Sequence, residues 1–176
     1  MNTSEIRTLF DYVYWANGRV LDAAERLSAD EFTTPSSVTT RDLRATLVHE
    51  LDVEWSWRLN LEGRLSDDEA DLNPDDYPDV ASIREHWSRD EAEMRAWLDT
   101  LDDDRLAAEV DSGLTSDRRP LWHYLMHLVM HAAQQQSDAA TLLTLAGQSP
   151  GDFDFGEYLA SAKSSDTPST DIDPWG

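Results

Sequence analysis

Apolar residues recur at intervals of three or four along four long segments of the chain, which is the spacing of a helix with one buried face. The segments run from about residue 4 to 27, 40 to 63, 80 to 101 and 120 to 146. No segment shows the alternation of apolar and polar residues that indicates a strand. The sequence therefore predicts an all-α protein, a four-helix bundle around one core.

Several helix ends carry residues that are typical of helix termini. Thr40 is predicted to cap the second helix, with Asp42 in its first turn. Pro120 suits the first turn of the fourth helix, and Gly147 suits its C-terminal end. Residues 102–119 are predicted to form a loop with a short extended piece. The acidic connection after the second helix is long, so the order in which the helices run up and down stays open.

The last part of the chain divides into an apolar and a polar piece. Four side chains are predicted to pack a short terminal helix on the bundle: Phe153, Phe155, Tyr158 and Leu159. From Lys163 onward the chain is polar and acidic. We therefore expect a bundle domain over residues 1–162 and a flexible acidic tail over residues 163–176.

The charge of the chain excludes several classes of partner. It has 36 acidic and 14 basic residues, a formal net charge of −22, and Lys163 is its only lysine. Such a surface repels nucleic acid and anionic membranes. The excess of acidic residues also indicates a halophilic protein, adapted to a salty cytoplasm whose ions screen the repulsion. The N-terminus lacks a signal-peptide pattern and no apolar run has the length of a membrane span. We therefore expect a cytoplasmic protein that binds neither membranes nor nucleic acid.

Three histidines at four-residue intervals are the clearest candidate for chemistry. His123, His127 and His131 share one stripe of the fourth helix, and Gln135 and Asp138 continue it. The rest of that helix is apolar, and polar groups buried there need a partner. The stripe is a metal site, an altered metal site or a polar seam, and His123, near the helix start, is expected to be partly exposed.

The residue best placed to complete a site is His49 on the second helix. Ala45 and Val53 lie one turn to either side of it, so an apolar surround and burial are expected. Asn17 interrupts the core face of the first helix and is a second inward polar group. A buried histidine is more often hydrogen-bonded than metal-bound, so the spacing leaves both readings open.

Other motifs carry less weight. The segment HELDV has Val53 where a zincin motif needs its second histidine, and cysteine is absent, which excludes disulfides, cysteine-ligated zinc and thiol nucleophiles. His86, among charged residues, is expected to be solvated. Paired carboxylates are too frequent in so acidic a chain to indicate a site.

Three segments in one order give the chain a family resemblance: LFDYVYWANGRVLDAAERLSADEF, LVHELDVEWSWRLNLEG and LWHYLMHLVMHAAQQQSDAATLLTLAGQSPGDFDFGEYL. The first carries an aromatic–Ala–Asn motif that ends at Asn17, and the second carries His49. Over about residues 5 to 160 the chain resembles the DinB/YfiT-like superfamily of proposed metalloenzymes. The resemblance implies a four-helix bundle whose metal site has one histidine on the second helix and two on the last.

The resemblance places the metal ligands at His49, His131 and Gln135. Family members usually have histidine where this chain has Gln135, which makes this an altered site. His127 is expected as a substitute ligand or a neighbour of the site, and Asp138 as a group that orients a ligand. A site that used His127 would have to slide by about 6 Å, one turn of helix.

The function that the resemblance implies is a metal-dependent enzyme. Zn or Ni is the expected divalent metal, and the chemistry is that of a transferase acting with a low-molecular-weight thiol, or related metal-dependent chemistry on a substrate that the sequence does not name. The alternative is a non-catalytic protein, stress-related or ligand-binding, whose metal site is weak or empty. In either case we expect a homodimer, with an exposed aromatic rim as its interface.

Overall fold

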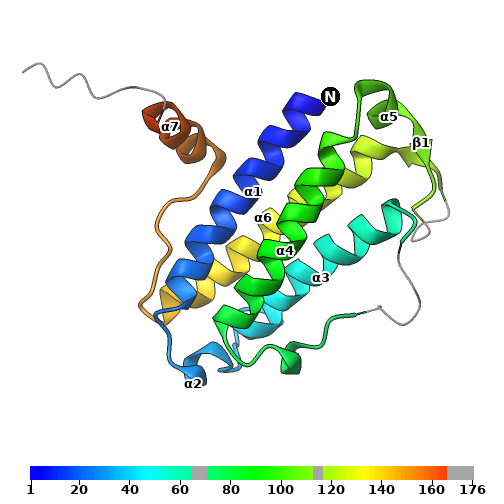
Figure 1. Ribbon diagram of the computed structural model, residues 1–176. Helices are drawn as coiled ribbons and strands as arrows, with labels where there is room; N and C mark the ends of the chain where they lie inside the picture. The colour runs from blue at the N-terminus through cyan, green and yellow to red at the C-terminus, as the bar shows by residue number, and fades with distance from the viewer. Residues whose placement is uncertain (65–70, 113–116, 166–176) are drawn as a thin grey trace, which may run out of the picture.

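Four long helices form the body of the protein, as the computed structural model shows (Figure 1). They are α1 (Thr3–Ala24), α3 (Leu43–Leu61), α4 (Val80–Asp99) and α6 (Leu121–Leu145). The structure describes residues 1–64, 71–112 and 117–165. The predicted all-α four-helix bundle is confirmed, and each long helix falls within a segment that the apolar periodicity marked.

The connections between the long helices contain short elements. They are α2 (Ala29–Phe32), the 3-10 helix η2 (Pro74–Asp76), α5 (Asp103–Ala107), and the strands β1 (Glu109–Val110) and β2 (Arg119–Pro120). The two strands pair antiparallel, which confirms an extended piece in the 102–119 connection. The prediction that this connection is otherwise a loop is wrong, because Asp102 caps the short helix α5 there by accepting the backbone N–H of Arg105.

Two of the predicted helix starts are displaced by two residues or less. Asp42, and not Thr40, caps α3, because its carboxylate accepts the backbone N–H of Ala45 at 2.8 Å. Pro120 lies outside α6, where it pairs with Glu109 in the small sheet. At the other end of α6, Gly147 has the predicted left-handed conformation, with φ of 76°.

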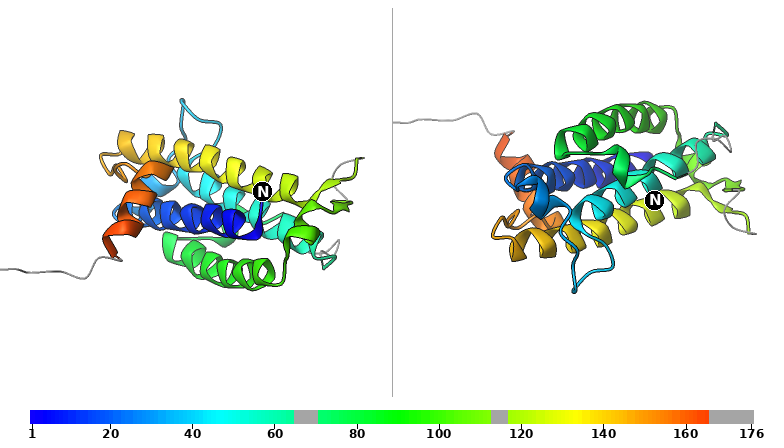
Figure 2. Two further views of the ribbon diagram at one scale, coloured as in Figure 1. Left: turned by 90° about the horizontal axis from the view of Figure 1, so that it is seen from above. Right: turned by 90° about the horizontal axis from the view of Figure 1, so that it is seen from below.

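The helices run up, down, down and up in chain order. Contacts show that α3 and α4 are parallel: Glu54 contacts Trp87, and Arg58, one turn later, contacts Asp90. Helices α1 and α6 are also parallel, because Asn17 contacts Gln136 and the later residue Arg26 contacts the later residue Gln148. Leu61 at the end of α3 and Val80 at the start of α4 therefore lie at opposite ends of the bundle. Helices α4 and α6 lie on opposite sides of α1 (Figure 2).

The core consists of two apolar clusters, one toward each end of the bundle. One centres on Val20, Leu47 and Leu143, and the other on Phe10, Met94 and Leu125. Polar side chains that are almost inaccessible to solvent join neighbouring helices within this core: Asn17, Glu50, Glu54, Arg58, Asp90, Gln135 and Gln136. Each of these groups must be satisfied inside the protein.

The terminal helix α7 (Phe155–Ser165) packs on α1 through Phe155 and Tyr158, whereas Leu159, which was also predicted to pack on the bundle, is 41% exposed. The rings of Phe155 and Tyr12 meet edge to face with their centroids 5.3 Å apart, and the ring centroids of Tyr158 and Trp15 are 5.7 Å apart. The helix continues three residues past the expected domain boundary at 162, and residues 166–176 of the expected tail lie outside the described residues. Within the described part of the chain, no helix is both long and apolar enough to cross a bilayer.

Candidate metal site

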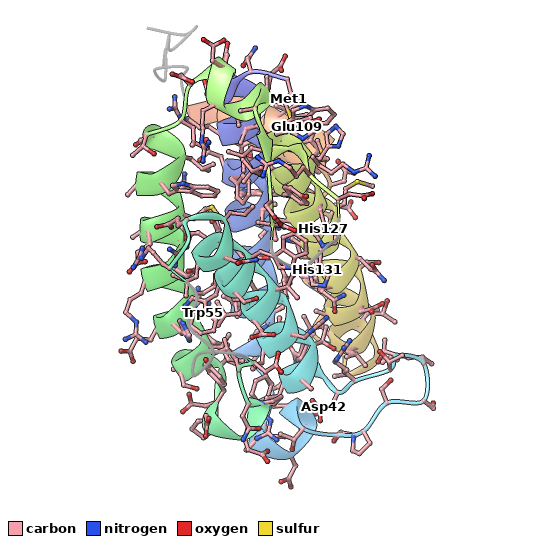
Figure 3. The ribbon with its side chains drawn as sticks, turned by 90° about the vertical axis from the view of Figure 1, so that its right-hand side faces the viewer. Met1, Asp42, Trp55, Glu109, His127 and His131 are labelled. Carbon is pink, nitrogen blue, oxygen red and sulfur yellow. The ribbon has the colours of Figure 1, made fainter. Side chains whose placement is uncertain are left out.

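The fold brings His49 and His131 together across α3 and α6, which run antiparallel. Their Nε2 atoms are 3.4 Å apart, and the rings meet nearly perpendicular, with centroids 5.1 Å apart. Figure 3 shows His127 and His131 following one another on the side of α6 that faces α3. The two histidines that sequence reasoning paired are therefore neighbours in space, with nitrogen facing nitrogen.

The separation of the two nitrogens fits a shared metal ion better than a direct hydrogen bond. Two imidazoles bound at about 2.05 Å in tetrahedral geometry place their nitrogens about 3.3 Å apart. Hydrogen bonds between nitrogen donors and their acceptors centre on about 2.9–3.0 Å. The observed 3.4 Å agrees with the first distance. The pair thus has the nitrogen separation that two imidazole ligands of one metal ion have.

Both imidazoles are held in the neutral form that a metal requires. Burial, followed by the charges of His49, His127 and Arg41, lowers the pKa of His131 to about 4. Burial and Arg41 also lower the pKa of His49, against the opposing effect of Asp52. His49 is half-buried and not enclosed as the sequence suggested, because Ala45 and Val53 beside it are half-exposed as well. The pair is therefore accessible from outside the bundle.

Gln135 is the buried member of the histidine stripe. It lies one turn after His131, is 4% exposed, and its Oε1 has no hydrogen-bond partner among the described residues. A buried acceptor without a partner is uncommon and fits a cation. The described residues contain no cluster of three or more His, Cys, Asp or Glu side chains able to hold a metal ion. The structure thus brings two imidazoles together, and Gln135 stays a predicted third ligand with an oxygen that is free within the described part of the chain.

The remaining residues of the stripe have different surroundings. His127 is exposed and its ring lies 4.8 Å from that of Trp57 and 6.1 Å from that of His131. His123 is exposed, which agrees with its expected position. Asp138, half-buried, has no ion pair with any residue that the structure describes. A site slid toward His127 would lose His49, because Trp57 is the α3 side chain that His127 meets.

The sequence comparison with protein families decides the relationship of the chain. The model of the DinB family matches residues 1–170, which include all of these stripe residues and His49. The chain belongs to the DinB family. No curated protein matches it closely enough to count as a relative. Family membership therefore supports the four-helix bundle fold. Any proposal about chemistry has to be argued from the residues of this chain.

This DinB chain also holds a buried carboxylate network that sequence reasoning missed. Glu54 accepts hydrogen bonds from the Tyr14 hydroxyl and from Trp87 Nε1, the latter at 3.3 Å. One turn further along α3, Arg58 forms an ion pair with Asp90, and both side chains are 1% exposed. Glu50, Glu54 and Arg58 recur at intervals of four on α3, a spacing that places them on one face of the helix but does not tell a buried face from a solvated one.

The other end of the network joins α6 to α1 and α3. The Nε2 atom of Gln136 donates to Asn17 Oδ1 at 2.6 Å, and lies 3.5 Å from Glu50 Oε1. Asn17 thus has the inward position that the sequence predicted. Glu50 is 1% exposed, and no basic side chain forms an ion pair with it among the described residues. Burial and the neighbouring Glu54 charge raise the pKa of Glu50 well above its usual range, against the opposing effect of its hydrogen bonds with Asn17 and Gln136.

His86 differs from its predicted surroundings. It is half-buried, and its Nδ1 atom lies 2.6 Å from the Tyr77 hydroxyl. The prediction of a solvated residue is wrong, because the connection before α4 folds back over this helix and stacks the Tyr77 ring on the imidazole. Burial and the charges of Arg89 and Arg58 lower the pKa of His86.

We expect the buried carboxyl groups to make folding weaken as pH rises. Burial and the Asp90 charge raise the pKa of Glu54 to about 8, and burial raises the pKa of Glu50 well above its usual range. For Glu54, the unfolded chain loses its proton near pH 4.5 while the folded chain keeps it up to about pH 8, and Glu50 acts in the same direction. Each retained proton then lowers the free energy of unfolding by about 1.4 kcal/mol per pH unit. Urea unfolding at several pH values measures this slope.

The variant Glu54→Gln isolates this effect from the general repulsion among surface carboxylates. Its amide can still accept from Trp87 and pair with Tyr14, but it has no proton to lose. The free energy of unfolding of this variant is expected to fall less steeply with pH, by about 1.4 kcal/mol per pH unit, the contribution of one proton. Equal slopes in the variant and the wild type would show that Glu54 is ionised in the folded protein.

Proposed function

We propose that this DinB-family protein binds one divalent metal ion, Zn or Ni, between α3 and α6 and acts as a thiol-dependent transferase or in related metal-dependent chemistry. The observation that carries the proposal is the 3.4 Å separation of the Nε2 atoms of His49 and His131. Gln135 supplies the third donor, since its buried Oε1 lacks a partner among the described residues. Three protein donors leave positions open for substrate, as catalytic sites require.

Each side chain has a separate part in this proposal. His49 and His131 hold the ion through neutral imidazole nitrogens, and Gln135 binds through a neutral, harder oxygen that zinc and nickel prefer less. When bound, the ion supplies a lowered pKa for a thiol or a water molecule at an open position. His127 and Trp57 form one wall beside the pair. Asp138 accepts a hydrogen bond from a group at the site and orients it.

A second candidate function is favoured by Gln135. A neutral amide in place of an imidazole weakens the site, so the protein would be a non-catalytic, stress-related or ligand-binding member of the family with a weak or empty metal site. Both candidates use the same fold and the same histidine pair between α3 and α6. They differ in whether the histidine pair holds a metal that a thiol can reach.

Titration of the cobalt-loaded protein with small thiols tests the enzymatic proposal. Cobalt takes the place of zinc and reports thiolate ligation by a new charge-transfer absorption band. We expect 2-mercaptoethanol to produce this band in the wild type, and His131→Ala to show neither cobalt binding nor the band. His123→Ala is the matched control, because His123 lies on the same helix, is exposed, and is eight residues before His131.

The possible results separate the two candidates. Cobalt binding followed by a thiolate band supports the metal-dependent function. Cobalt binding without the band, at thiol concentrations in the millimolar range, would rule out thiol chemistry at the metal. Absence of cobalt binding in the wild type would favour the non-catalytic alternative.

A further inference from the structure

A cavity between α3 and α4 lies apart from the histidine pair. Its volume is about 310 Å³, and the residues that line it include Trp55, Arg58, Arg64, His86 and Arg89. Figure 3 shows Trp55 on the side of α3 that faces α4, whereas His131 lies on the other side, on α6. The cavity shares no residue with the candidate metal site, so a ligand bound there would be separate from the metal.

The lining of this cavity has more positive than negative charge, although the chain as a whole has a net charge of −22. Three arginines line it, against two carboxylates, those of Asp90 and Glu93. Four other cavities of the described chain have acidic or uncharged linings. At about 0.1 M salt, charges more than about 10 Å away are largely screened. A ligand in the cavity therefore experiences chiefly the charges that line it, and these favour an anion.

Two of the three guanidinium groups are already paired with carboxylates of the protein. Arg58 is 1% exposed and forms ion pairs with three side chains, those of Glu62, Asp90 and Glu93. Arg64 is paired with Glu62 at 2.8 Å. Arg58 is thus fixed in the wall of the cavity, and its donors are occupied.

Arg89 is the arginine of the cavity that remains available. It is exposed, and it forms no ion pair or hydrogen bond with any residue that the structure describes. It lies three residues after His86 on α4, so the two side chains share one face of that helix. A planar guanidinium presents N–H donors that bind the two oxygens of a carboxylate or phosphate together. Arg89 can therefore bind an anion that enters the cavity.

His86 supplies a second free donor. Its Nδ1 atom lies 2.6 Å from the Tyr77 hydroxyl, which has no other acceptor among the described residues. We therefore assign the hydroxyl as the donor to Nδ1, which places the proton of the neutral imidazole on Nε2. The Nε2–H group has no partner within the described part of the chain. It can donate to the same anion as Arg89, one turn away on α4.

The α3 side of the cavity is aromatic and apolar. Trp55 and Leu59 lie one turn apart on this helix and both line the cavity. The ring of Trp55 is nearly perpendicular to that of His86, with the centroids 6.0 Å apart. An indole and a leucine side chain offer apolar area on which a flat ring can be buried. The two sides of the cavity thus favour two different parts of one ligand.

We propose that this cavity binds a small anionic ligand in which a carboxylate or phosphate group is attached to a flat ring. The anionic oxygens accept from the Arg89 guanidinium and from His86 Nε2, and the ring lies against Trp55 and Leu59. A volume of about 310 Å³ is at the small end of the range for ligand sites, which fits a compound with a single ring. Carboxylate and phosphate share this recognition, and titration with both kinds of ligand distinguishes them.

Calorimetric titration with four probes tests the class of ligand. The protein is first treated with EDTA and dialysed, so that no metal ion binds the probes. We expect benzoate or phenyl phosphate to bind at one per chain, with a dissociation constant of about 1 mM or less. Inorganic phosphate, which lacks the ring, is expected to bind about tenfold more weakly than phenyl phosphate. Benzylammonium, which has the ring but the opposite charge, is expected not to displace either ring anion.

Three variants locate the bound anion. Arg89→Gln is expected to weaken the binding of both ring anions by about tenfold or more, because it removes a charge-assisted hydrogen bond. His86→Phe keeps a ring beside Tyr77 but has no donor, and it is also expected to weaken binding. Arg41→Gln is the matched control and should bind as the wild type does. It removes the same charge just before α3, outside the cavity, from an arginine that also has no ion pair among the described residues.

The outcomes that would overturn the proposal are distinct. Failure of both ring anions to bind at millimolar concentration would exclude the ligand class. Unchanged affinity in Arg89→Gln, or an equal loss in Arg41→Gln, would show that the anion binds elsewhere. Equal affinities for inorganic phosphate and phenyl phosphate would exclude the contact of a ring with Trp55.

Discussion

Arg58→Leu is expected to lower the free energy of unfolding by about 3–5 kcal/mol, a large share of the stability of a domain this size. Arg58 is 1% exposed and forms an ion pair with Asp90, which is also 1% exposed. It also contacts Glu62 and Glu93, each at 2.9 Å. Leucine fills much of the space but leaves the Asp90 carboxylate buried without its cation, and a buried unpaired charge is costly.

Two further variants show whether burial is the cause. Arg84→Leu removes an arginine that pairs with Asp22 and Glu25 at the surface, where its side chain is 35% exposed, and is expected to cost less than about 1 kcal/mol. Arg58→Leu combined with Asp90→Leu removes both charges and should recover most of the lost stability. Chemical denaturation of the four proteins measures this. A loss for Arg58→Leu no larger than that for Arg84→Leu would contradict the account.

The helices of the bundle were predictable because each buries one face, and that leaves a regular apolar period in the sequence. The pairing of His49 with His131 was predictable for a similar reason, since isolated polar residues on apolar faces have to meet. The short helix α5 has only five residues, too few to show a period. The cap at Asp42, in place of Thr40, depends on which of two acceptors reaches Ala45.

The buried carboxylates could not be recognised from the sequence for a different reason. In a chain with 36 acidic residues, glutamates at intervals of four usually belong to a solvated helix face. Glu54 is distinguished only by Tyr14 and Trp87, which come from α1 and α4 and meet it in the folded protein. A polar network whose members lie on different helices becomes visible once the packing of those helices is known.

Gln135→His is expected to tighten zinc or nickel binding by at least about tenfold, on the order of 1.4 kcal/mol. Imidazole is a softer and better donor to these ions than an amide oxygen. Position 135 lies one turn after His131, and Gln135 there is 4% exposed, so an imidazole ring at this position faces the inside of the bundle. The metal dissociation constant, measured by competition with a chromophoric chelator, gives the change.

A neighbouring glutamine provides the control for this variant. Gln134→His adds the same imidazole at an exposed position on the adjacent face of α6 and should leave the affinity unchanged. If both variants tighten binding equally, the added histidine acts as a surface ligand. If neither does, the third coordination position is elsewhere.

Calorimetric titration of zinc into the metal-free wild type, His49→Ala and His131→Ala tests the central claim most directly. We expect one zinc ion per chain in the wild type. Each variant is expected to lose more than about 100-fold in affinity, because mutation of residues that only orient metal ligands already lowers affinity by up to that factor. A wild type that binds no zinc or nickel at millimolar concentration, or that binds as tightly without His49 and His131, would contradict it.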